Sequence, residues 1–247
     1  KNPSKKLSKA WLNGYIGILD AYLGKVPESF EYKGKTYTPK TFAESLGLNM
    51  NDYVPLTSFT HHDFYKPFVL EVPDNWGHSL YYNVKMEELK AVVDNAIENG
   101  YTVLWAADVS EKGFKWYDGV ALMPKVDRKA SMEGTELDRW VKLKDSEKVD
   151  KMYDFKGPVE EIVVTQESRQ EGFDNYETTD DHGMVIVGTA VDQKGNKYYK
   201  VKNSWDSEQV YKGYFYVSEP YFLAKTMSIW VNKKGVPSDI LKKLNLK

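Results

Sequence analysis

The sequence predicts an α+β fold with helices in its first part and an antiparallel sheet in its last part. Apolar residues recur at three- and four-residue spacing near the start and again around residue 90, which is typical of amphipathic helices. After residue 180, short apolar and aromatic stretches alternate with tight turns, as antiparallel strands do. We therefore expect a helical and loop-rich part at residues 1–100 and a β-rich domain at residues 101–247.

Three helices are predicted in the first hundred residues. The first covers residues 4–23 and ends at a glycine, and a hairpin at residues 30–37 leads to a short Thr-Pro-initiated helix at 38–46. Residues 49–78 are rich in aromatic and turn residues and favour strands and long loops. The third helix covers residues 86–99 and has a strongly amphipathic pattern.

The second part begins with a buried strand and ends with several more. Residues 108–156 are rich in charge and have little periodicity, which predicts a surface-exposed segment with one helix at 145–153. Thr165 is the expected N-cap of a further helix that reaches Phe173. The expected strands cover residues 101–105, 183–191, 197–201, 213–217 and 227–231, with a turn at 193–196.

Composition excludes several classes of protein. The 247 residues carry a net charge of −2, which gives no electrostatic footprint for nucleic acid. No apolar stretch approaches the roughly 20 residues that a membrane-spanning helix needs. There is no cysteine, so disulfides and thiolate metal sites are excluded, although this leaves the compartment open. We expect no cofactor, no metal, no membrane association and no nucleic-acid partner.

His182 and Asn203 form the strongest candidate site. They are 21 positions apart, and two strands joined by a tight turn separate them, so the ends of this hairpin come together. The Asn203 carboxamide is then placed to fix the tautomer and orientation of the imidazole. A neutral amide behind a histidine suits a cysteine–histidine ion pair better than a serine nucleophile. Trp205 follows two residues later and is expected to shield this hydrogen bond from water.

Other polar residues are weaker candidates. His61, His62 and Asp63 are potential zinc ligands, but neighbouring side chains on an extended segment point in opposite directions, so we expect a structural or surface role. Asp180 and Asp181 precede the candidate base and are expected to cap or solvate the turn, close enough to influence the imidazole. Asp181 joins Trp205 as a candidate substrate-binding or shielding residue.

Several quoted stretches resemble a known family. "DDHGMVIVG", "YYKVKNSWD" and "GYFYVS" resemble the histidine- and asparagine-bearing half of papain-like cysteine peptidases. "VTQESRQEGFDNYETTDDHGM", "TVLWAADVSEKGF" and "SIWVNKKGVPSDIL" are similar to the bleomycin hydrolase and aminopeptidase C branch. The resemblance covers nearly the whole chain as the C-terminal part of such an enzyme. It implies a papain-like fold whose β-rich half, with helical insertions, packs against a helical, cysteine-bearing half.

The resemblance also implies roles and partners. His182 matches the general base, Asn203 the residue that orients it and Trp205 the shielding ring, whereas the cysteine and the oxyanion glutamine have no counterpart. We therefore expect the cysteine on a separate chain, the N-terminal part of one precursor cut ahead of Lys1, and expect this chain alone to be inactive. The resemblance implies peptide substrates, a possible homo-oligomer and, by analogy, a cytoplasmic location, with a secreted or periplasmic one left open.

Two functional questions stay open at this stage. The chain ends short of the C-terminal arm that enforces aminopeptidase action in many members of this branch, so dipeptidyl-peptidase and endopeptidase action remain alternatives. Because the nucleophile is absent, a peptide-binding or assembly module without catalysis is the alternative reading of the same residues.

Overall fold

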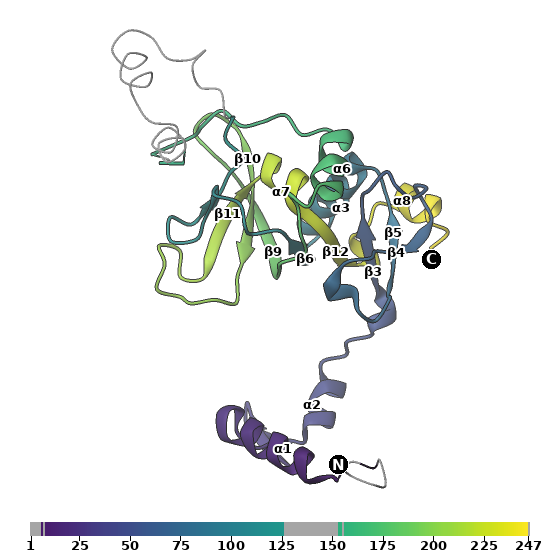
Figure 1. Ribbon diagram of the computed structural model, residues 1–247, viewed down its shortest axis with the longest axis vertical. Helices are drawn as coiled ribbons and strands as arrows, with labels where there is room; N and C mark the ends of the chain where they lie inside the picture. Colours follow the sequence, from purple (N-terminus) through teal and green to yellow (C-terminus); the bar gives the residue numbers. More distant parts are fainter. Residues whose placement is uncertain (1–5, 7, 126–152, 155, 247) are drawn as a thin grey trace. The chain divides into compact units, whose positions relative to one another are not determined.

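The computed structural model describes residues 6, 8–125, 153–154 and 156–246 (Figure 1). The chain divides into two compact units, Lys1–Met50 and Asn51–Lys247. This division does not coincide with the expected boundary at residue 100, because strands from residues 53–83 pair into the sheet that carries the candidate site. The helix expected at 145–153 lies almost wholly outside the described residues.

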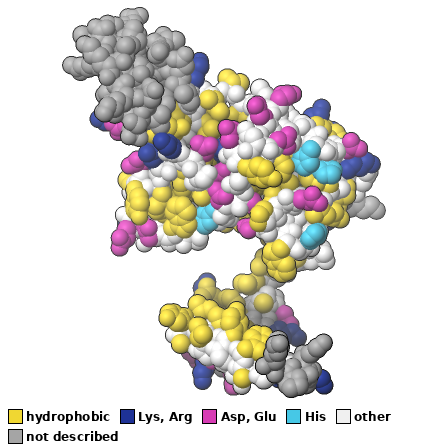
Figure 2. Space-filling model, in the orientation of Figure 1, with side chains coloured by type: hydrophobic (Ala, Val, Ile, Leu, Met, Phe, Trp, Pro, Cys, Tyr) yellow, Lys and Arg dark blue, Asp and Glu magenta, His cyan; other side chains and the backbone are white. Residues whose placement is uncertain are grey.

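The first unit consists of two helices and a hairpin. Helix α1 (Ala10–Leu23) precedes strands β1 (Phe30–Tyr32) and β2 (Lys35–Tyr37), and helix α2 (Pro39–Ser45) follows. The hairpin and the second helix agree with the prediction, whereas α1 begins later than the predicted residue 4. None of the described residues in this unit is fully buried. Large apolar side chains of α1 are therefore exposed, and they form the yellow surface of this unit in Figure 2.

A mixed sheet of ten strands forms the second unit in the described part of the chain. Its strand order is β4-β5-β3-β12-β6-β9-β10-β11-β8-β7, and neighbours are antiparallel except for the parallel pairs β3–β5 and β8–β11. The strands are β3 (Tyr53–Thr57), β4 (Pro67–Val69), β5 (Leu80–Asn83), β6 (Val103–Ala107), β7 (Phe114–Lys115), β8 (Val120–Ala121), β9 (His182–Val191), β10 (Lys197–Lys202), β11 (Tyr214–Ser218) and β12 (Thr226–Asn232). The predicted α+β class is confirmed, and the sheet is larger and more mixed than the late strands alone suggested.

Helices α3 (Met86–Glu98) and α7 (Glu219–Lys225) of the second unit pack on this sheet. Helix α3 buries one side in the main core, as its periodicity predicted. Helix α6 (Gln166–Asp174) begins where predicted, because the Thr165 hydroxyl accepts the Ser168 N–H at 3.1 Å. Among the described residues, the remaining helical segments are η1 (Met50–Asp52), η2 (Pro73–Asn75), η4 (Lys233–Gly235) and α8 (Ser238–Lys243).

Strands β9 and β10 form the hairpin that brings the candidate site together. The Asp192 carboxylate accepts the backbone N–H groups of Lys194 and Asn196, which fixes the predicted turn at 193–196. The two strands pair in antiparallel register down to Val185 opposite Lys202, and strand β6 flanks β9 on its other side. The open end of the hairpin therefore holds the first residue of β9 next to the residue that follows β10.

Packing in β9 gives a first prediction. Ile186 is fully buried, whereas Val191 at the end of the same strand is 72% exposed. We expect Ile186→Ala to lower the free energy of unfolding by about 2–5 kcal/mol, because it leaves a cavity in the core. Val191→Ala is the matched control and should change that free energy by less than about 0.5 kcal/mol in urea unfolding. Equal losses in both variants would contradict the described register.

Candidate active site

His182 and Asn203 are joined by a short hydrogen bond. The distance between His182 Nε2 and Asn203 Oδ1 is 2.7 Å. The same Oδ1 accepts the Ser204 backbone N–H at 2.7 Å, so the orientation of the amide is fixed by a donor whose identity is unambiguous. Because an amide oxygen only accepts, Nε2 carries the proton of this bond. The other ring nitrogen, Nδ1, is left to act as a base.

The backbone around Asn203 holds its side chain in place. Asn203 directly follows β10, and its N–H donates to the Gly213 carbonyl at 3.0 Å. The residue is only 6% exposed, and a buried hydrogen bond is stronger electrostatically than one in water. Its Nδ2 group has no hydrogen-bond partner among the described residues. The amide is thus held chiefly through its oxygen, the atom that orients the imidazole.

The Trp205 ring lies against the imidazole, and its expected shielding role stays a prediction. Its ring centroid lies 5.1 Å from that of His182, with the two planes tilted by 31°. Edge contacts with Phe114 and Trp116, at centroid distances of 5.7 and 5.3 Å, also hold the indole. Trp205 remains 46% exposed, so the surface beside His182 is partly apolar and open to an approaching molecule.

Asp181 contacts the backbone near His182. Its carboxylate accepts the Val109 N–H at 3.2 Å and the Thr179 hydroxyl at 2.6 Å. These bonds tie the segment before β9 to the end of β6. Its suggested part in binding or shielding a substrate stays a prediction.

Asp180 is an acidic group in a cavity beside the site. The cavity has a volume of about 630 Å³, and Asp180 and Asp181 lie in its wall with Glu71 and Asp174. Burial raises the pKa of the Asp180 carboxyl to about 6, and the charges of Asp74 and Asp181 add to this effect. The charge of this wall therefore changes near neutral pH.

His61 and His62 pack against aromatic rings. The His61 ring stacks on Phe173 at a centroid distance of 5.2 Å, and the His62 ring stacks on Phe68 at 4.3 Å. His61 Nδ1 also lies 3.1 Å from Gln170 Nε2. Within the described ranges, no group of three potential ligands gathers in a way that would hold a metal ion. Both imidazoles therefore have packing contacts that account for them without an ion.

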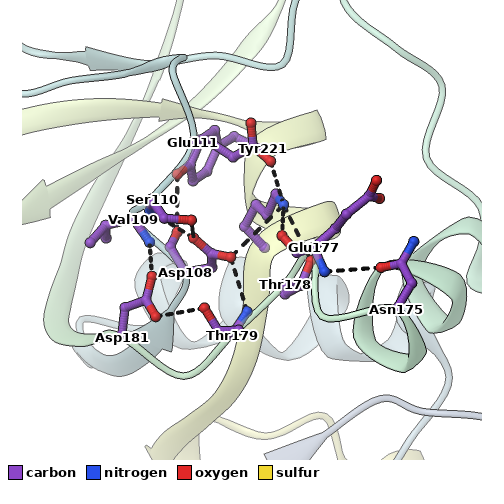
Figure 3. Close-up of polar contacts among 11 residues, drawn as sticks. Asp108, Val109, Ser110, Glu111, Asn175, Glu177, Thr178, Thr179, Asp181 and Tyr221 are labelled. Carbon is purple, nitrogen blue, oxygen red and sulfur yellow. Dashed lines mark hydrogen bonds and ion pairs between the residues drawn. The ribbon is translucent and has the colours of Figure 1, made fainter.

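Sequence reasoning missed the polar network behind His182. The buried Asp108 side chain contacts the residues leading into β9 (Figure 3). The buried Lys225 side chain contacts the same residues and lies 3.9 Å from Asp108. Asp108 and Lys225 are 117 positions apart by subtraction, so no local spacing links them. Two sequence features could have indicated this network. Asp108 is a charged residue at the end of an apolar strand, and Lys225 directly follows the apolar stretch 221–224.

The fold and this site define the class of protein. A histidine at the start of one strand, an asparagine after the next and a covering tryptophan lie on a papain-like fold. The solved structure of PepW from Lactobacillus rhamnosis HN001 superposes with a TM-score of 0.64 at 20% identity, and the match covers 95% of this chain and 49% of that one. This likeness shows the fold.

Sequence comparisons identify the family. The model of the Peptidase C1-like family matches residues 22–133 and 129–247, so the chain belongs to that family. Aminopeptidase G of Lactobacillus delbrueckii subsp. lactis is 26% identical over 253 residues, covering 95% of this chain and 50% of the relative. Aminopeptidase C of Lactococcus lactis subsp. cremoris is 28% identical over 238 residues, with 90% and 48% covered. The chain spans about half the length of the curated relatives it matches.

These findings confirm the resemblance to the aminopeptidase C branch, while the narrower likeness to bleomycin hydrolase stays a prediction. In the part of the chain that the structure describes, no helix is long and apolar enough to cross a membrane.

The raised pKa of Asp180 gives a second prediction. Because folding favours the neutral acid, its contribution to stability is fully present below the unfolded pKa of about 4 and is lost as the pH rises through about 6. Asp180→Asn keeps a neutral side chain at every pH. We expect it to raise the free energy of unfolding by about 1 kcal/mol at pH 7.5, after allowing for solvent screening of this half-buried group.

The gain should vanish at pH 4, and urea unfolding at both pH values measures it. Asp63→Asn is the control, since Asp63 is exposed and does not line this cavity. A gain that is the same at both pH values would contradict the environment described for Asp180.

Proposed function

We propose that this chain is the base-bearing half of a papain-like cysteine peptidase that hydrolyses peptide bonds. The observation that carries the proposal is the 2.7 Å bond between His182 Nε2 and Asn203 Oδ1, which leaves Nδ1 free to meet a thiol. Membership of the Peptidase C1-like family supports it. In the proposed assembly, the thiol belongs to a separate polypeptide, because these 247 residues contain no cysteine.

The proposed reaction proceeds through an acyl-enzyme. The cysteine thiolate, paired with protonated His182, attacks the peptide carbonyl carbon and forms a carbon–sulfur bond. His182 then donates its Nδ1 proton to the leaving amine as the carbon–nitrogen bond breaks. In the second half, His182 takes a proton from water, and the resulting hydroxide attacks the thioester and releases the acid and the thiolate.

Asn203 and Trp205 support the base in this scheme. The amide oxygen accepts from Nε2 in both protonation states of the ring, so His182 keeps one orientation while Nδ1 gains and loses its proton. The neutral amide suits an imidazolium that a thiolate already balances. The indole limits access of water to this bond. The names of the relatives favour aminopeptidase action on peptides, with dipeptidyl-peptidase and endopeptidase action as alternatives.

A nucleophile-free peptide-binding or assembly module is the second candidate function. The absence of cysteine from the chain favours it, since the same surface beside His182 and Trp205 is open without a thiol. The two candidates differ in one observable, which is hydrolysis that depends on His182.

The proposed two-chain arrangement predicts a labelled partner. Material purified from the native source through this chain should contain a second polypeptide that reacts with an epoxide or fluoromethyl-ketone thiol trap, because a thiolate beside an imidazolium is unusually reactive. Intact-mass analysis with and without the trap measures this. If no co-purifying chain gains the mass of the trap, the separate-chain proposal fails.

Substitutions at the proposed base should separate catalysis from binding. We expect His182→Ala in the assembled enzyme to lower kcat by about a factor of 100 to 10,000, because the acid and base steps are lost. Asn203→Ala should lower kcat by about tenfold or more, since the ring loses its orienting bond. Rates of peptide hydrolysis measure both changes.

His78→Asn is the matched control for these variants, because His78 is exposed and its positive φ of 53° suits asparagine. It should leave kcat unchanged. Peptide binding with no hydrolysis in the wild type, or hydrolysis that survives His182→Ala, would favour the non-catalytic candidate over the proposed enzyme.

A further inference from the structure

A buried charged pair lies behind the segment that leads to His182. Lys225 is the last residue of α7 and is 3% exposed. Its Nζ donates to the Glu177 carbonyl at 2.6 Å and lies 2.6 Å from Glu111 Oε1. The same ammonium lies 3.3 Å from the Thr178 hydroxyl and 3.9 Å from Asp108 Oδ2. The Lys225 ammonium therefore contacts two carboxylates, one backbone carbonyl and one side-chain hydroxyl.

Asp108 holds the next residue of the same segment. One carboxylate oxygen accepts both the N–H and the hydroxyl of Ser110 at 2.7 Å, and the other accepts the Thr179 N–H at 2.9 Å (Figure 3). Burial by itself raises the pKa of the Asp108 carboxyl, but these hydrogen bonds and the charge of Lys225 outweigh burial and lower it. Asp108 is therefore held as a carboxylate in a buried position.

These anchors lie next to the start of β9. Ala107, the residue before Asp108, is the sheet partner of His182. Asp181 completes the attachment, because its carboxylate bonds the Val109 N–H and the Thr179 hydroxyl (Figure 3). Residues 177–181 are thus fixed to residues 108–111 at several successive positions. A shift of this segment would displace the first residue of the strand, which is His182.

A second line of contacts runs from Asp108 to the tryptophan ring that lies against the imidazole. The Tyr221 hydroxyl donates to the Asp108 carbonyl at 3.0 Å, and the Tyr221 ring contacts Phe114 at a centroid distance of 6.2 Å. Phe114 in turn contacts Trp205, which covers His182. The surroundings of Asp108 therefore contact both the backbone that carries the imidazole and the rings that cover it.

We propose that Asp108 and Lys225 are positioning residues for the His182–Asn203 pair, which rests on the function proposed above. They set where residues 177–181 meet the end of β6, and so hold the imidazole where Nε2 reaches the Asn203 oxygen. Replacing a buried ion pair by apolar groups is often neutral for stability, so a buried ion pair is weak evidence for a role in stability alone. Their hydrogen bonds converge on the segment before His182, which a merely structural pair would not need.

The test uses Lys225→Met, which keeps the length of the side chain and removes its charge and donors. We expect the His182 Nε2 proton of the isolated chain, observed by nitrogen-15 NMR, to exchange with water about tenfold faster or more, because its bond to Asn203 is populated less. In the assembled enzyme, kcat should fall by about a hundredfold while KM stays within about twofold. Lys225→Arg should restore most of both, since it keeps the charge and donors.

Two further variants keep the test decisive. Lys90→Met is the matched control: Lys90 lies 3.8 Å from Asp94 and 3.2 Å from Glu219, and none of its ion pairs involves residues 177–182. It should leave the His182 signal unchanged. If Lys225→Met does not fold, Asp108→Asn combined with Lys225→Met removes both charges and leaves neither of the two buried unpaired.

A folded variant that lacks the pair but keeps wild-type exchange at His182 Nε2 would overturn the proposal. The NMR measurement needs no partner chain or activity. Suppose that the variant exchanges faster at His182 Nε2 but no peptidase activity is ever found. The positioning role is then supported while the proposed enzyme fails, so the two failures are distinguishable.

Discussion

The hydrogen bond between His182 Nε2 and Asn203 Oδ1 is the interaction on which the proposed function of this chain depends. Its geometry follows from the sheet, because β9 begins at the histidine and β10 ends one residue before the asparagine. The register contains one irregularity between Lys200 and Val201, and the strands remain paired beyond it down to Val185. Antiparallel pairing thus brings together two side chains that are 21 positions apart and directs a neutral amide at the ring.

Three features surround this bond: a buried asparagine, a covering indole and a buried pair of charges. Burial of Asn203 and the cover of Trp205 protect the bond from water, while the buried charges of Asp108 and Lys225 fix the backbone that leads to it. The partly exposed indole keeps the surface beside the imidazole accessible. Such an arrangement leaves the imidazole oriented by buried polar contacts and its surroundings open to an approaching group.

Local sequence patterns predicted much of the fold and the centre of the site. The amphipathic period of α3, the Thr165 cap of α6 and the turn at 193–196 all depend on neighbouring residues, and the structure has each of them. The meeting of His182 and Asn203 was also predictable, because a single hairpin separates them. Their proposed catalytic roles came from the resemblance to a family and not from spacing alone.

Features that depend on distant pairing were not predictable in this way. Strand β3 pairs with β12 and, in parallel, with β5, so residues 53–83 join a sheet that the late strands alone did not reveal. The partners of Asp108 and Lys225 come from three separate segments, residues 108–111, residues 177–179 and helix α7, and no periodicity links them. Asp181 was expected near the imidazole, but its carboxylate bonds backbone and hydroxyl groups that only the folded chain brings near.

The pH dependence of alkylation of the cysteine on the proposed partner chain tests the central claim most directly. The claim requires an imidazole that holds the thiol as a thiolate. With wild-type chain bound, the cysteine should react with a neutral reagent such as chloroacetamide at pH 5–6, well below the ordinary thiol pKa of about 8.5. With His182→Ala bound equally well, the reactivity should return to that ordinary range. A thiol whose profile is the same with either chain would contradict the claim that His182 is its base.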